Sequence, residues 1–129
     1  MKKLFLTPTP SLFLLAALFL PAAALAHDDH GKPQFGGIVA EGGVFQLELV
    51  LQARRVVLHI SDHGKPLEVK GGTARLTLLA GDRKSEVALV PSGTRFEASG
   101  DFPAAAGTKA VAVVTLPGQK AVTARFAVK

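Results

Sequence analysis

The sequence predicts an all-β protein, because most of the chain consists of short runs in which apolar and polar residues alternate. Gly, Pro, Asp and Ser residues interrupt these runs at short, regular intervals, and no stretch after residue 30 has the period of an amphipathic helix. We therefore expect a β-sandwich of roughly seven or eight short strands, immunoglobulin-like or cupredoxin-like in architecture. A partly open barrel is the variant that the same pattern allows.

Seven runs have the alternation of a half-buried strand. In the first of them, Leu47, Leu49 and Leu51 share one face, and Gln46 and Glu48 share the other. The last two runs flank a Pro-Gly-Gln turn, which indicates a hairpin. The expected strands are residues 44–52, 54–61, 73–80, 85–91, 94–98, 109–116 and 120–128.

The start of the chain has the three regions of a secretory signal peptide. Lys2 and Lys3 form the basic region, residues 12–20 the apolar region, and Ala24-Leu25-Ala26 a cleavage site with small residues. The apolar run is shorter than the roughly 20 residues that a membrane span needs. We therefore expect cleavage, a periplasmic location and no membrane span in the mature chain.

Cleavage after Ala26 would give the mature protein an unusual first residue. The expected parts of the chain are a signal peptide (1–26), a flexible N-terminal segment (27–35) and one β-sandwich domain (36–129). His27 would then offer its free amine and its ring nitrogen to one Cu(II), Ni(II) or Zn(II) ion. Cleavage after Ala24 is the alternative. It places His27 third, where the amine, two amides and the ring can surround Cu(II) or Ni(II).

Composition excludes several classes of function. The chain has 15 Lys and Arg against 10 Asp and Glu, and no Cys, Trp or Tyr. Because the basic residues are scattered, we expect no nucleic-acid surface, which needs a basic stripe and usually stacking aromatic rings. Ser61, Asp62 and His63 are sequence neighbours rather than members of separate elements, so they do not predict a catalytic triad, and we expect no enzyme.

All four histidines lie within a few residues of an aspartate, in "AHDDHG" (26–31) and "LHISDHGKP" (58–66). Imidazole and carboxylate ligands suit Cu(II), with Zn(II) as the second choice. A single Met and the absence of Cys exclude a sulfur site selective for Cu(I). The predicted metal ligands are His27, His30, Asp62 and His63, with His59 as a candidate fifth.

Two simpler interpretations of the same residues stay open. The segment "HDDHGKP" is also what a solvated N-terminal tail looks like, since chain termini are commonly disordered. Asp62 followed by Gly64 and Pro66 is ordinary turn chemistry, in which a short acidic side chain caps its own backbone.

Three stretches carry a resemblance to known proteins: "FGGIVAEGGVFQLELVLQ", "DHGKPLEVKGGTARLTLLAG" and "EVALVPSG". They resemble small periplasmic proteins encoded beside heavy-metal efflux systems of the resistance-nodulation-division type, and segments of the periplasmic adaptor subunits of such exporters. The resemblance extends over residues 34–99 and implies partnership with a heavy-metal efflux complex. The family pattern opens with a His-Gly-Gly-like element. Here Phe35 precedes the two glycines, so no ligand is carried over to that position. The start of the mature chain is also similar to cupredoxin-like copper carriers, which begin at a His and use a later Asp and His.

Two functions of different classes follow. The first is a periplasmic protein that binds Cu(II) or a similar divalent ion and serves an efflux system. The second is an immunoglobulin-like interaction module that binds no metal and docks on an exporter or envelope protein. Its expected docking face carries Arg54, Arg55, Arg75 and Arg125.

Overall fold

The computed structural model describes residues 31–129, so the predicted signal peptide lies outside the described residues. The alternating runs form antiparallel strands, and residues 31–129 contain no α-helix. No helix in this part of the chain is long and apolar enough to cross a membrane. The strands are β1 (Ile38–Gly42), β2 (Phe45–Leu51), β3 (Arg55–Asp62), β4 (Lys65–Pro66), β5 (Thr73–Ala80), β6 (Arg83–Ser92), β7 (Arg95–Ser99), β8 (Lys109–Thr115) and β9 (Val122–Ala127).

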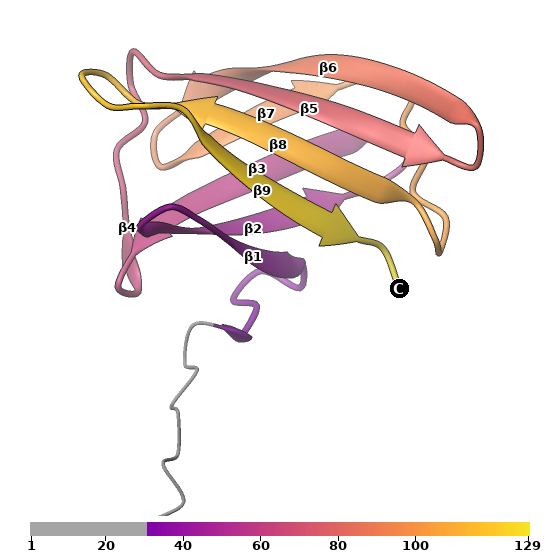
Figure 1. Ribbon diagram of the computed structural model, residues 1–129, viewed down its shortest axis with the longest axis horizontal. Coiled ribbons are helices and arrows are strands. Elements are labelled where there is room, and N and C mark those ends of the chain that lie inside the picture. Colours follow the sequence, from indigo (N-terminus) through magenta and orange to yellow (C-terminus); the bar gives the residue numbers. More distant parts are fainter. Residues whose placement is uncertain (1–30) are drawn as a thin grey trace, which may run out of the picture.

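The strands form one nearly closed sheet that is folded into two layers (Figure 1). Its order is β1-β2-β3-β7-β6-β5-β8-β9, with the short β4 beside the end of β3. Strand β6 belongs to both layers, because it pairs with β5 as far as Leu89 and with β7 from Val90 onward. At the opposite side, β1 approaches β9, where Gly42 and Gly43 lie against Val122. The arrangement is therefore closest to the partly open barrel.

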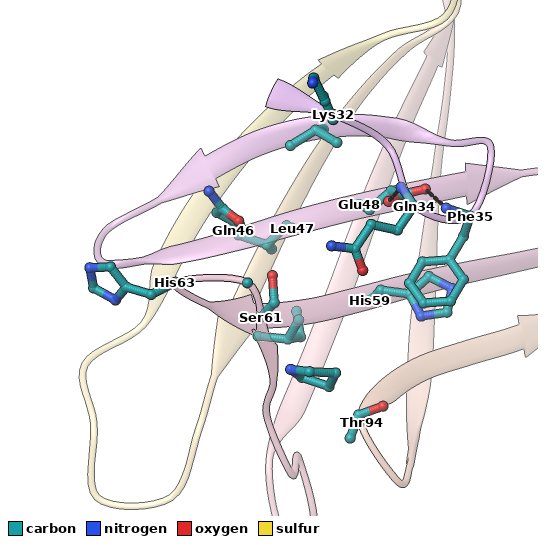
Figure 2. A pocket seen from close by; sticks show the side chains of 14 residues that line it. Lys32, Gln34, Phe35, Gln46, Leu47, Glu48, His59, Ser61, His63 and Thr94 are labelled. Carbon is teal, nitrogen blue, oxygen red and sulfur yellow. Dashed lines mark hydrogen bonds between the residues drawn. The ribbon is translucent and has the colours of Figure 1, made fainter. Parts of the chain in front are cut away.

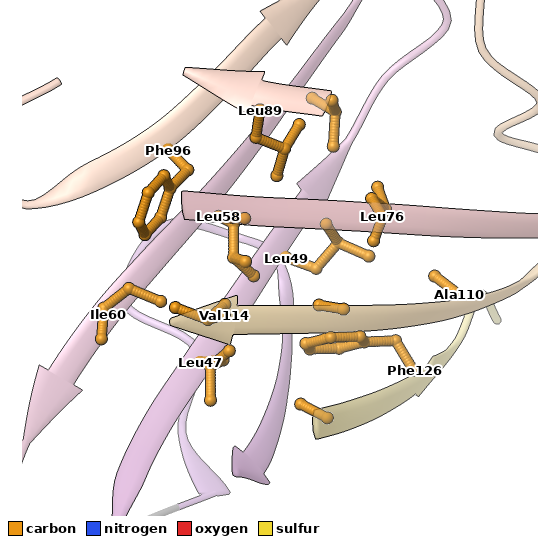
Figure 3. Close-up of a cluster of buried hydrophobic side chains, with 14 of the residues drawn as sticks. Leu47, Leu49, Leu58, Ile60, Leu76, Leu89, Phe96, Ala110, Val114 and Phe126 are labelled. Atoms are coloured by element: carbon orange, nitrogen blue, oxygen red, sulfur yellow. The ribbon is translucent and has the colours of Figure 1, made fainter. Parts of the chain in front are cut away.

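The core lies between the two layers (Figure 3). It is built from the apolar side chains that alternate with polar ones along the predicted strands. Leu47 and Leu49 from β2 and Leu58 from β3 are fully buried. From the other layer, Leu76 and Val114 meet them. This inner face fixes the register, because a shift of one residue would turn every apolar side chain outward.

All seven expected strands are present, and the all-β prediction is confirmed. Strand β1 was missed because Glu41, Gly42 and Gly43 look like a turn in the sequence. In the structure the strand continues to Gly42, and only Gly43 and Val44 form the loop. Gly43 has a positive φ of 61°, which glycine adopts without steric cost at the first position of a tight hairpin loop. With β1 and the two-residue β4, residues 31–129 contain nine strands.

Replacing Leu58 with Ala tests the core. Leu58 pairs with Leu49 in β2 and with Phe96 in β7, and its side chain is completely buried. We expect Leu58→Ala to lower the free energy of unfolding by about 2–5 kcal/mol through lost burial and a residual cavity. Chemical denaturation measures this change in the free energy of unfolding. The matched control is Leu79→Ala on an outer face, where the side chain is 36% exposed and the expected loss is below about 1 kcal/mol. Equal losses in the two variants would contradict this description of the core.

Candidate functional site

The outer face of β1, β2 and β3 is covered by residues 32–37, which we call the strap. Beneath it lies Glu48, which is only 7% exposed although it points away from the core. Its carboxylate accepts three backbone hydrogen bonds, from Gln34 (2.6 Å) and Phe35 (2.8 Å), which Figure 2 labels, and from Gly37 (2.9 Å). The burial of this charge is thus compensated by three donors from one short segment.

The two glycines of the strap allow this close approach. Gly36 has a positive φ of 74°, which a residue with a side chain rarely adopts. A Cβ atom on Gly37 would lie 2.4 Å from the carbonyl oxygen of Leu49, so any larger residue would push the strap off β2. The Gly-Gly pair of the sequence therefore serves to bring the backbone onto the strand.

Phe35 and His59 form a stacked pair at one end of the strap. Their ring centroids are 3.7 Å apart and their planes differ by 8°. His59 lies directly across from Glu48 in β2 and from Arg95 in β7. Burial lowers the pKa of His59 below its ordinary value of 6.5; Arg95 and Arg55 act in the same direction, and Glu48 opposes them. His59 is consequently a neutral ring near neutral pH.

A cavity of about 290 Å³ lies between the strap and the strands. Figure 2 shows Phe35 and His59 at one end of it and His63 at the other, with Lys32 and Thr94 on opposite sides. Its wall also includes neutral polar side chains, among them Gln34, Gln46 and Ser61. The size of this cavity is at the lower limit of small-molecule sites.

The turn between β3 and β4 carries the other histidine of the cavity. Asp62 pairs with Lys65, and the two residues between them both have positive φ, 50° at His63 and 80° at Gly64. This is the geometry of a tight two-residue hairpin. The Nδ1 atom of His63 lies 2.5 Å from Oδ1 of Asp62. The turn thus has both the ordinary hairpin structure and a carboxylate–imidazole pair at its tip.

The predicted metal ligands are only partly within the described residues. Asp62 and His63 are brought together, whereas His27 and His30 lie outside the described residues. His59, the candidate fifth ligand, is three positions before Asp62 on the same strand, so their side chains point to opposite faces. Within residues 31–129 no group of three or more His, Cys, Asp or Glu side chains could hold a metal ion. The metal site therefore stays a prediction that needs ligands from the N-terminal histidines.

Sequence reasoning missed Glu48 and Phe35. Glu48 was assigned correctly to the polar face of its strand, but an alternating pattern does not show what covers that face. Two weak signals were available: an aromatic residue directly before a Gly-Gly pair, and an acid between Leu47 and Leu49. Neither identifies its partner, because the contacting residues are 11 to 14 positions apart.

The four arginines expected to form one docking face are divided between the two layers. Arg55 lies on the outer face of β3, where it donates to Glu97 at 2.8 Å and holds the pKa of that carboxyl below its ordinary value. Arg75 lies on β5 in the other layer and pairs with Glu86 at 3.5 Å. Arg125 is also in that layer, on β9. The prediction that these arginines form one docking face is therefore wrong, because the strands that carry them belong to opposite layers.

No family model, curated protein or solved structure matches the chain. The motif resemblance to efflux-associated proteins accordingly stays a prediction. Because a fold alone does not assign a function, the chemistry of the strap, the cavity and the turn has to indicate it.

The Glu48 carboxylate can be tested by an isosteric change. We expect Glu48→Gln to lower the free energy of unfolding by about 2–3 kcal/mol, because an amide group replaces a charged acceptor facing N–H donors. Amide hydrogen exchange should accelerate at Gln34, Phe35 and Gly37. Glu41→Gln, a change at an exposed position on neighbouring β1, is the control and should leave both measurements unchanged. Unaltered exchange at the three strap amides of the Glu48 variant would refute the role of the carboxylate.

The lowered pKa of His59 predicts a pH dependence. Just below pH 6.5 the unfolded chain binds more protons at this residue than the folded chain does. The contribution of neutral His59 is therefore fully present above its ordinary pKa and is lost as the pH falls toward the folded-state pKa. We expect His59→Gln to flatten the rise in stability between about pH 5 and pH 7, measured by denaturation at a series of pH values. An identical slope in the wild type and the variant would contradict it.

Proposed function

We propose that this chain is a periplasmic metal-binding accessory protein that serves a heavy-metal efflux complex. The proposed ion is Cu(II), with Zn(II) as second choice, and the proposed ligands are His27, His30, Asp62 and His63. The observation that carries the proposal is that His63, which lines one end of the cavity, is paired with Asp62, and that Lys32, two residues after His30 in the sequence, lines the same cavity.

The Asp62–His63 pair has the chemistry of a metal anchor. When a carboxylate binds one ring nitrogen of a histidine, it fixes the tautomer and the orientation of the ring, and it increases the basicity of the other nitrogen. With Nδ1 of His63 directed at Asp62, Nε2 is the coordinating nitrogen in this proposal. In the alternative arrangement Asp62 turns to the ion and supplies an oxygen ligand itself.

The length of the chain is compatible with ligands from the N-terminal histidines. Lys32 and His63 line the same cavity. His30 is two residues before Lys32 in the sequence, and two residues of extended chain span about 7 Å. A free amine or a further imidazole at His27 would complete three or four nitrogen and oxygen ligands, a set that suits Cu(II). The same proposal also includes cleavage of the signal peptide and a periplasmic location. It further includes a fold of the cupredoxin-like or immunoglobulin-like type.

The interaction module is the weaker candidate. It was based on a basic docking face, and Arg55 and Arg75 lie in opposite layers, each with an acidic partner. Exposed apolar side chains are present at Val44 (72%) and Val90 (64%). They belong to the β1–β2 loop and to β6, and single exposed apolar residues are common on monomers.

The metal proposal is tested on protein purified from the periplasm after expression with its own N-terminus. The intact mass gives the cleavage site, and native mass spectrometry with one equivalent of Cu(II) and a competing chelator gives the affinity. We expect one tightly held ion, and a loss of affinity of about tenfold or more in His63→Ala and in Asp62→Asn.

Lys65→Ala, a change at an exposed residue of the same hairpin, is the matched control and should retain the affinity of the wild type. His27→Ala, at a proposed ligand, should also weaken binding if the mature chain begins at or near that residue. Copper affinity that does not change in His63→Ala would reject the proposed site. An equal loss of copper affinity in Lys65→Ala would show that the variants act by disturbing the hairpin and not by removing a ligand.

A further inference from the structure

The first half of β6 has one edge without a neighbouring strand, because β7 pairs with β6 only from Val90 onward. We propose that this edge pairs with the same edge of a second copy of the chain, antiparallel and about a two-fold axis at Ser85. The sheets of the two molecules then become continuous. Strand β6 carries none of the proposed metal ligands, so the inference does not rest on the proposed function.

The direction of the backbone groups on β6 follows from the turn that precedes it. Ala80 and Arg83 pair across a two-residue loop, in which Gly81 has a positive φ of 63°. The residues that flank such a loop exchange both of their backbone hydrogen bonds. The backbone groups of Arg83 and of every second residue after it therefore point to β5. The residues whose N–H and C=O groups point to the unpaired side are Lys84, Glu86 and Ala88.

This unpaired edge is accessible to solvent. Residues 83–86 are all exposed, and Figure 1 shows β6 along the upper border of the molecule. A hollow of about 660 Å³ lies beside the strand, lined by residues 83–85 of β6 and by residues 101–103. The strands at the two ends of the sheet order, β1 and β9, contact each other instead. The start of β6 therefore has room for a further strand.

The outer face of this half of β6 carries one charge of each sign. Leu89 is buried on the inner face of β6, so Lys84 and Glu86 lie on the outer face. Glu86 is 3.5 Å from Arg75 of β5 in an exposed ion pair. Lys84 makes no ion pair with another residue of 31–129. The spacing of two residues between a lysine and a glutamate is self-complementary in an antiparallel pair of identical strands.

Charge selects one register among the symmetric ones centred on residues 84–87. With the axis at Ser85, Lys84 of each copy lies directly across from Glu86 of the other, and both are hydrogen-bonded backbone pairs. An axis at Lys84 or at Glu86 would set two like charges face to face, which destabilises a sheet. An axis at Val87 would set Glu86 across from Ala88 and form no ion pair.

The same two charges restrict which strands can pair with β6. A charged side chain on an edge strand disfavours pairing with an unmatched strand, and it thereby prevents aggregation. In the register at Ser85 each charge meets its opposite, so Lys84 and Glu86 oppose other strands and favour a second copy. Two hydrogen-bonded residue pairs and two ion pairs form a small interface. We therefore expect a weak dimer that dissociates on dilution.

The experiment measures the self-association of the purified protein by sedimentation velocity over a wide range of protein concentration. The protein is first stripped of metal with a chelator, so that no ion shared by two chains contributes. We expect the fraction of dimer in the wild type to increase with concentration. Amide hydrogen exchange at Lys84 and Glu86 should become slower over the same range, because these two N–H groups become hydrogen-bonded in the dimer.

Two charge reversals and their mixture test the register. Lys84→Glu sets like charges against each other in the dimer, and so does Glu86→Lys, so each should weaken self-association by about tenfold or more. An equimolar mixture of the two variants has opposite charges in every pair and should form a dimer of unlike chains as readily as the wild type dimerises. The matched control is Arg125→Glu, on an exposed position of β9 in the same layer, which should dimerise like the wild type.

Three results would overturn the proposal. The first is a wild type that stays monomeric at millimolar concentration or dimerises only after Cu(II) is added. The second is self-association of Lys84→Glu equal to that of the wild type. The third is a mixture of the two variants that associates no more than either variant does alone.

Discussion

Three backbone N–H groups donate to one carboxylate, and the form of the outer face depends on that contact. An anion removed from water destabilises a protein unless hydrogen bonds replace the lost hydration, and Glu48 is 7% exposed. Gln34, Phe35 and Gly37 supply the replacement, and in doing so they hold the strap across β2. The Phe35–His59 stack and the roof of the cavity both exist because the strap is held there.

The core determines where this carboxylate stands. Leu47 and Leu49 are completely buried on the inner face, so Glu48 between them must point outward. The same alternation on β3 turns Leu58 inward and His59 outward, and the β2–β3 register sets His59 opposite Glu48. A slip of one residue would bury the acid and the imidazole in the core. The packing of the apolar core therefore fixes the geometry of the polar site, and no further interaction is needed to orient Glu48 and His59.

How much of this could be predicted from the sequence differs between the core and the site. The seven alternating runs gave seven strands and most of the inner face, since burial on one side of a strand leaves a local pattern with a period of two. Strand β1 escaped notice because Gly42 continues a strand although glycine usually marks a turn. The contact between Glu48 and the strap has no local signature. It joins segments 11 to 14 residues apart through backbone donors, which every residue except proline possesses.

The two ends of the cavity are suited to different chemistry, and the geometry of β3 is the reason. From His59 to Asp62 the extended strand advances about 10 Å and the side chains alternate faces. One ion, with ligand bonds of about 2 Å, is thus not shared by His59 and the Asp62–His63 pair. The turn end has the imidazole of His63, which is paired with Asp62, whereas the strap end has the stacked rings of Phe35 and His59.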